Sequence, residues 1–169
     1  MKTVAQLLKL KVQENQKVHT ISPDDMVLQA LMDMAAKNVG ALLVVKKTKT
    51  LLNAEEMTED VKTGKQFEEV EEVVGIISER DYARKLVLHG RSSVGTPVRD
   101  IMVKDVITVD THQTVDTCLG IMSDKRLRHL PVVENGKLIG LLSIGDLVKE
   151  AIAEQAELIK QLEQYIRGE

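Results

Sequence analysis

One pattern occurs twice in this 169-residue sequence: a glycine, two apolar residues, a serine and, three residues after the serine, an aspartate. The first copy is GIISERD, with Ser78 and Asp81, and the second is GLLSIGD, with Ser143 and Asp146. S-x-x-D is the pattern of a helix capping box, in which the serine hydroxyl accepts a backbone N–H and the acid faces the positive helix end. Each such cap stabilises a helix by about 1 kcal/mol.

The same spacing also suits a binding site. A strand that ends at the serine and turns into a helix leaves backbone N–H groups free at the helix start, where the dipole attracts a phosphate. An aspartate in that first turn can accept both hydroxyls of a ribose, while the serine hydroxyl donates to a phosphate or sugar oxygen. The pattern therefore indicates either two helix caps or two sites that bind sugar and phosphate together.

The segments that must position these motifs are duplicated as well. Residues 18–45 align without a gap on residues 106–133, and the second halves of the two copies align from Val74 and Ile139. Apolar residues at i, i+3, i+4 and i+7 in each copy predict a helix with one buried face. These residues are Val27, Ala30, Leu31 and Met34 in the first copy, and Val115, Cys118, Leu119 and Met122 in the second.

Short β-rich runs follow each of these helices, and Asn135-Gly136 between two of them predicts a tight hairpin. The segments after Ser78 and Ser143 have helical patterns again. Each copy therefore reads strand, helix, strand, strand, helix, and the fold class is α/β (α+β). We expect five parts: an N-terminal helix and lead-in at 1–17, a first repeat at 18–90, a linker helix at 91–105, a second repeat at 106–155 and a C-terminal helix extension at 156–169.

The parts outside the repeats leave alternatives open. Residues 46–72 insert between the halves of the first repeat, and their charged ends predict a long polar hairpin or a mobile loop. Thr96 before Pro97 suits the N-cap and first position of the linker helix. The apolar stripe of the C-terminal helix can pack on a partner chain or on its own core. Met32, Met34 and Met122 are expected to fill the core.

Composition excludes several classes of protein. A formal charge of −3 gives no overall attraction to nucleic acid or to an anionic membrane, and no segment has the apolar length of a membrane span. A single cysteine, Cys118, and the absence of a signal peptide favour a cytoplasmic protein. The histidines lack metal-ligand spacing, so no metal is required, and no hydrolase or kinase motif occurs. We therefore expect a protein that is not an enzyme.

Taken together, the duplicated strand-to-helix motifs resemble a pair of CBS (cystathionine-β-synthase) domains, the tandem unit called a Bateman module. The resemblance covers nearly the whole chain and rests on three segments of each repeat. These are a first strand, VHTI or VITV, a second strand, GALLVV or RHLPVV, and the pattern hGhhSxxD, with h for an apolar residue, at the start of a second helix. It implies repeats related by a pseudo-twofold axis, with two clefts that usually accept adenosine-containing ligands such as AMP, ATP, NAD or S-adenosylmethionine. Such modules sense ligands more often than they catalyse reactions.

The resemblance also implies site residues in each cleft. The first cleft would use Thr20, Gly40, Ala41, Leu42, Ser78 and Asp81, and the second would use Thr108, His129, Leu130, Pro131, Ser143 and Asp146. Arginine offers a planar fork that suits phosphate, so we place four arginines near bound phosphates. They are Arg80, Arg99, Arg126 and Arg128. Because Arg80 corresponds to Gly145, and Gly40 to Arg128, the two sites should differ.

The sequence therefore predicts a regulatory module that binds AMP, ATP or NAD(H) and transmits the state of that ligand to an unknown effector protein. The module is expected to be a homodimer that binds neither nucleic acid nor membranes. The alternative is an interaction or dimerisation scaffold whose clefts hold no ligand.

Overall fold

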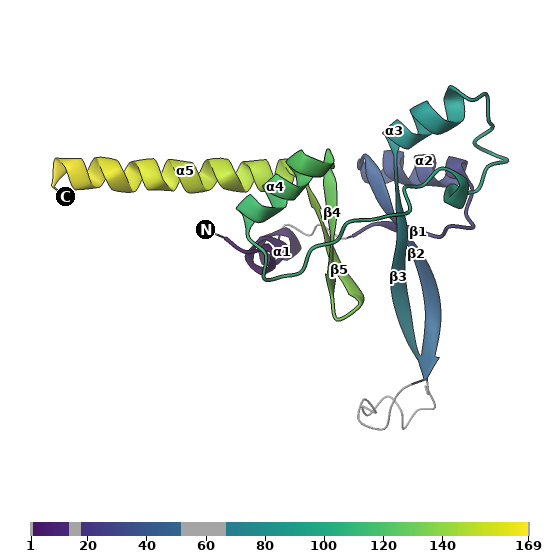
Figure 1. Cartoon of the computed structure of the whole chain (residues 1–169), viewed down its shortest axis with the longest axis horizontal. Coiled ribbons are helices and arrows are strands. Elements are labelled where there is room, and N and C mark those ends of the chain that lie inside the picture. The colour runs from purple at the N-terminus through teal and green to yellow at the C-terminus, as the bar shows by residue number, and fades with distance from the viewer. Residues whose placement is uncertain (1, 14–17, 52–66, 169) are drawn as a thin grey trace. The chain divides into compact units, whose positions relative to one another are not determined.

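The computed structural model describes residues 2–13, 18–51 and 67–168 and shows a mixed α/β protein (Figure 1). The chain divides into two compact units. One comprises Met1–Val18, Ile107–Glu134 and Ile139–Glu169, and the other comprises His19–Val106 and Asn135–Leu138. The N-terminal lead-in is therefore grouped with the second repeat, and the linker at 91–105 is grouped with the first.

The first repeat contains a three-stranded sheet in the order β1-β2-β3. Its elements are β1 (Thr20–Ile21), α2 (Val27–Lys37), β2 (Ala41–Leu51) and β3 (Phe67–Ser78). β1 pairs with β2 in parallel, and β2 pairs with β3 in antiparallel register. The buried face of α2 packs on this sheet to form the core of the unit. After β3 the chain enters α3 (Glu79–Asp81), which continues directly into the wider π-helical turns of η2 (Tyr82–Val87).

The second repeat is built from α4 (Val115–Lys125), β4 (His129–Glu134), β5 (Lys137–Ser143) and α5 (Ile144–Arg167). β4 and β5 form a two-stranded sheet, and Asn135 and Gly136 both have positive φ at the turn between them, which confirms the predicted hairpin. The expected strand at 106–109 is reduced to a single parallel bridge between Val109 and Val132. Its position matches the pairing of Ile21 with Val44 in the first repeat.

The short lead-in segment that precedes each repeat packs on the core of the other repeat. α1 (Val4–Gln13) contributes Val4 and Leu7 to the core of the second repeat, whereas the short 3₁₀ helix η3 (Val98–Asp100) contributes Val98 to the core of the first. The backbone contacts are equivalent: the N–H of Val115 donates to Lys2 O, and the N–H of Val27 donates to Thr96 O. Each lead-in therefore covers the repeat that it does not immediately precede.

The insertion in the first repeat begins and ends as a hairpin. β2 and β3 stay paired from Ala41 opposite Ser78 out to Leu51 opposite Phe67. This register places lysines of β2 opposite glutamates of β3, and Lys47 lies 3.8 Å from Glu69. Opposite charges facing each other across the strands favour this pairing. The predicted polar hairpin is confirmed for these strands, and the remainder of the insertion, 52–66, lies outside the described residues.

Two local predictions were wrong. The linker forms one turn of 3₁₀ helix with Pro97 as its N-cap, so Thr96 does not cap it; Thr96 is buried instead, and its carbonyl accepts the N–H of Val27. Met34 and Met122 are buried as expected, but Met32 is 56% exposed because it lies outside the apolar stripe of α2. Among the described residues, no helix combines the length and the apolar character that a membrane span needs.

Candidate functional site

Both strand-to-helix junctions form complete capping boxes. At the first junction, the N–H of Asp81 donates to Ser78 Oγ at 3.2 Å, and the N–H of Ser78 donates to Asp81 Oδ2 at 3.0 Å. At the second junction, the corresponding distances for Asp146 and Ser143 are 3.1 and 2.8 Å. The helix-cap interpretation of S-x-x-D is therefore confirmed in both copies.

The expectation of several free N–H groups at each helix start was largely wrong. Ser78 and Asp81 use their N–H groups in the capping box, and the N–H of the intervening Glu79 donates to Gly40 O at 3.2 Å. Equivalent bonds form at the second junction, where the N–H of Ile144 donates to Arg128 O at 2.8 Å. Among the described residues, this leaves the N–H of Arg80 and its counterpart, Gly145, without a partner in the first turn.

The aspartate of each junction pairs with a lysine that could not be assigned to the site from the motif: Lys85 pairs with Asp81, and Lys11 pairs with Asp146. Lys85 Nζ lies 3.2 Å from Asp81 Oδ1 and donates to Ile101 O at 3.0 Å. Lys85 follows Asp81 by four residues on the same helix, a spacing that could have revealed the pair. The lysines therefore neutralise charge at both junctions, although they come from different elements.

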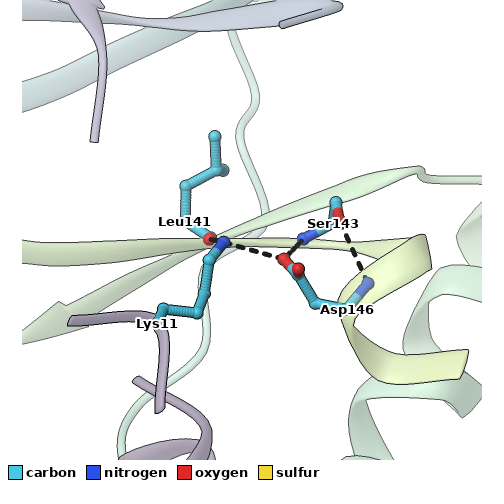
Figure 2. A network of polar contacts seen from close by, with 4 residues as sticks. All are labelled: Lys11, Leu141, Ser143 and Asp146. Carbon is cyan, nitrogen blue, oxygen red and sulfur yellow. Dashed lines mark hydrogen bonds and ion pairs between the residues drawn. The ribbon is translucent and has the colours of Figure 1, made fainter. Parts of the chain in front are cut away.

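At the second junction the lysine is Lys11, which comes from the last turn of α1. Figure 2 shows its Nζ donating both to Asp146 Oδ2 and to the carbonyl oxygen of Leu141, each at 2.7 Å. The side chains of Lys11 and Asp146 are only 20% and 22% exposed. No local pattern could have revealed this contact, because it depends on how α1 packs against β5 and α5. Asp146 Oδ2 also accepts the N–H of Ser143, so two donors share one oxygen.

These contacts shift the pKa values of two residues at the second junction. Burial alone would raise the pKa of Asp146, but the hydrogen bonds from Lys11 and Ser143 outweigh it and lower that pKa below its ordinary value. Burial lowers the pKa of His129, as do the positive charges of Lys11 and Arg128, and only Asp146 opposes them. The second junction therefore combines an ionised carboxylate with an imidazole that is neutral at pH 7.

The glycine of each motif leaves space for an apolar side chain of a lead-in segment. A Cβ on Gly75 would collide with the side chain of Met102, and a Cβ on Gly140 would collide with the side chain of Leu8. Met102 and Leu8 are equivalent residues of the two lead-ins, so the two glycines perform the same packing role. The repeated glycine is thus explained by close packing next to the junction.

Backbone atoms of several other predicted residues lie at or near the junctions. Gly40 and Arg128 supply the carbonyls described above, and Pro131 O accepts the N–H of Val109. The Leu42 and Leu130 side chains are buried in the cores of their units, and Ala41 is also buried. Thr20 begins β1, whereas Thr108 is exposed just before the bridge at Val109.

The predicted arginines occupy different settings. Arg80 is exposed in the first turn after Ser78, and Arg128 is exposed beside His129. Arg99 lies on η3, where its guanidinium pairs with Asp24 at 2.5 Å. Arg126 is the C-cap of α4 in a left-handed conformation with φ of 55°, as is its counterpart Asn38 with φ of 54°. Among the described residues, no group of three His, Cys, Asp or Glu side chains is arranged to hold a metal ion.

Comparisons with known proteins identify the family. A model described as CBS domain matches residues 98–153. The CBS domain-containing protein CBSX3, mitochondrial, of Arabidopsis thaliana is 39% identical over 147 aligned residues. These residues cover 86% of this chain and 62% of the length of that relative. A solved CBS-domain protein from Burkholderia ambifaria MC40-6 is 44% identical, with a TM-score of 0.72 over 91% of this chain and 96% of that one.

A more distant structure shares the fold. The CBS domain pair of protein MJ0100, solved in complex with 5'-methylthioadenosine and S-adenosyl-L-methionine, is 18% identical, with a TM-score of 0.64 over 91% of this chain and 98% of that one. The Burkholderia structure is similar in both sequence and fold over almost its whole length. The chain therefore belongs to the CBS-domain family and contains a pair of CBS domains.

Proposed function

We propose that this protein is a regulatory sensor that binds an adenosine-containing ligand, AMP, ATP or NAD(H), at one or both junctions. The observation that carries the proposal is the duplicated junction itself. In each repeat a capping box holds an aspartate at a defined position, next to the N–H of Arg80 or Gly145, which has no partner among the described residues. A carboxylate can accept ribose hydroxyls, and a helix-start amide can donate to a phosphate.

Family membership supports the same ligand class, because the CBS pair of MJ0100 has been solved with two adenosine compounds. The two junctions are expected to differ in preference. Lys11 pairs with Asp146, and His129 interacts with both of them and with Arg128, whereas Asp81 has Lys85 and the exposed Arg80. The second junction therefore differs chiefly by the His129 imidazole, which is neutral at pH 7 and can donate or accept a hydrogen bond.

The test is calorimetric titration of the full chain with AMP, ATP and NADH, together with Asp81→Asn and Asp146→Asn. Asparagine keeps an oxygen that can accept the N–H of the cap serine, but it loses the charge and the paired acceptors. Each variant should therefore weaken binding at its own junction at least tenfold. Glu79→Gln is the matched control, because Glu79 is an exposed acid in the same helical turn. Absence of saturable heat with all three nucleotides would rule the proposal out.

An effector protein would respond to the ligand only if it prefers one of the states that the ligand stabilises. In this proposal the protein has no catalytic activity of its own and works as a cytoplasmic homodimer. A pull-down with and without the bound nucleotide identifies the effector, and mass spectrometry of small molecules that copurify with the protein identifies the ligand. Identical sets of captured proteins in both conditions would contradict a sensing role.

The second candidate function is a scaffold that binds no nucleotide. The observation that favours it is that both capping boxes are complete by themselves and that Lys11 already occupies Asp146 Oδ2. Under this alternative, Asp81→Asn and Asp146→Asn change only stability. The same titration therefore separates the two candidates.

A further inference from the structure

The second half of α5 presents an apolar surface that nothing covers among the described residues. α5 buries only Leu147 and Glu150, both near its beginning. Beyond them six large apolar side chains are between 54% and 84% exposed: Ile152, Leu158, Ile159, Leu162, Tyr165 and Ile166. Figure 1 shows this helix continuing as one straight rod past β4 and β5. A helix segment without tertiary packing is only marginally stable in water, so this surface calls for a partner.

The helix has no residue at which it would bend and fold this apolar surface back onto its own unit. Between Gly145 and Gly168 the helix contains neither glycine nor proline, the residues at which helices usually kink. Its apolar residues also follow the seven-residue spacing of a helix-pairing surface. With Ile152, Ile159 and Ile166 at position a, position d holds Val148, Gln155 and Leu162.

We propose that α5 pairs in antiparallel orientation with α5 of a second copy of this chain. This arrangement packs Ile152 against Leu162 of the second copy, and Ile166 against Val148 of the second copy. Ala156 then meets its own counterpart at the centre, where a small residue allows the helices to approach closely. The contact is self-complementary, as a twofold dimer requires.

The side chains that flank the contact favour the antiparallel arrangement over the parallel one. In the antiparallel pair, Ala156 and Leu158 flank the centre of the contact, and both are apolar. Leu158 meets its own counterpart. In a parallel pair, Leu158 would instead lie beside Glu163 of the second copy, and Gln155 would pack on Gln155.

The area available is sufficient for a specific dimer. Burial of one aliphatic side chain of this size corresponds to roughly 60–120 Å² of apolar surface. The six exposed apolar side chains of α5, taken on both copies, therefore supply about 1,000 Å², which is the lower range of specific protein interfaces. The inference concerns only α5 and does not depend on nucleotide binding.

The first experiment compares Ile159→Asp with Gln161→Asp by sedimentation of the full chain at several concentrations. Ile159 lies in the stripe and Gln161 lies outside it, so the two variants add the same charge at different faces. Wild type and Gln161→Asp should be dimers. Ile159→Asp should raise the dissociation constant roughly 100-fold or more, because each dimer loses two buried isoleucines. A monomeric wild type, or an Ile159→Asp protein that dimerises as tightly as wild type, overturns the proposal.

The second experiment tests orientation by cross-linking with a short bis-maleimide. Cys118 is the only natural cysteine and is buried, so single introduced cysteines report on their own positions. Ala156→Cys should form covalent dimers. Ile166→Cys should not, because an antiparallel pair places the two copies of residue 166 more than about 20 Å apart at 1.5 Å per residue. Cross-linking through Ile166→Cys but not through Ala156→Cys would establish a parallel pair and refute the proposed orientation.

Discussion

Replacing Lys11 by methionine removes the ammonium group that joins α1 to the second junction. Methionine retains an unbranched side chain, so the packing of the stem is largely preserved. The change removes the hydrogen bonds to Asp146 Oδ2 and Leu141 O, both 2.7 Å long. Asp146 remains bound to Ser143 but loses its cation, while staying 22% exposed.

We expect this change to lower the free energy of unfolding by about 1.5–3 kcal/mol at pH 7. Hydrogen bonds to charged groups contribute that range. An exposed ion pair would contribute less than about 1 kcal/mol, and loss of one partner of a fully buried pair would cost about 3–5 kcal/mol. The Lys11–Asp146 pair falls between these limits because both side chains are about one-fifth exposed.

The loss should depend on pH in a defined direction. The folded-state pKa of Asp146 is lower than its ordinary value of 3.8, so ionised Asp146 stabilises the fold above that pH. This contribution disappears as the pH falls through the folded-state pKa. In Lys11→Met, burial continues to raise the pKa of Asp146 while the main opposing interaction is gone. The difference between wild type and variant should therefore be largest near neutral pH and should shrink below about pH 4.

Urea unfolding followed by circular dichroism, at one protein concentration and at several pH values, measures this difference. Lys9→Met is the control, because Lys9 is exposed on the same helix and its replacement should change stability by no more than about 0.5 kcal/mol. A carbon-13 NMR titration of the Asp146 carboxyl reports its pKa directly. A Lys11→Met protein no less stable than Lys9→Met, or an Asp146 pKa that does not rise, would contradict the stabilising role of Lys11.

Three further outcomes follow from individual contacts. Gly140→Ala should lower stability by about 1–3 kcal/mol in thermal unfolding, and adding Leu8→Ala to this variant should recover part of the loss by removing the clash. Gly120→Ala in α4 is the control, because a Cβ at this position meets nothing within 4 Å, and it should raise stability by up to about 1 kcal/mol. In a proton NMR titration the His129 midpoint should lie below 6.5, with stability decreasing as the pH falls through that region; a midpoint above 6.5 would contradict the buried position. Arg126→Gly should stabilise the fold by about 1 kcal/mol, because φ at this C-cap is 55°, and unchanged thermal stability would count against strain there.

The repeated unit and most of its local structure follow from the sequence alone. The apolar spacing from Val27 and from Val115 identified the buried faces of α2 and α4, because helix periodicity is a local property. The capping boxes at Ser78 and Ser143 were also predictable, since each involves residues three positions apart. Residue patterns of this kind need no knowledge of distant contacts.

The electrostatics of the second junction depended on contacts between distant segments. Lys11 reaches Asp146 from the other end of the chain, and Leu8 occupies the space that Gly140 leaves open. Neither pairing has a signal in local spacing, because α1 packs on the repeat that it does not precede. The capping boxes thus arise from neighbouring residues, whereas the charge around each aspartate depends on which distant segment the folded chain packs against it.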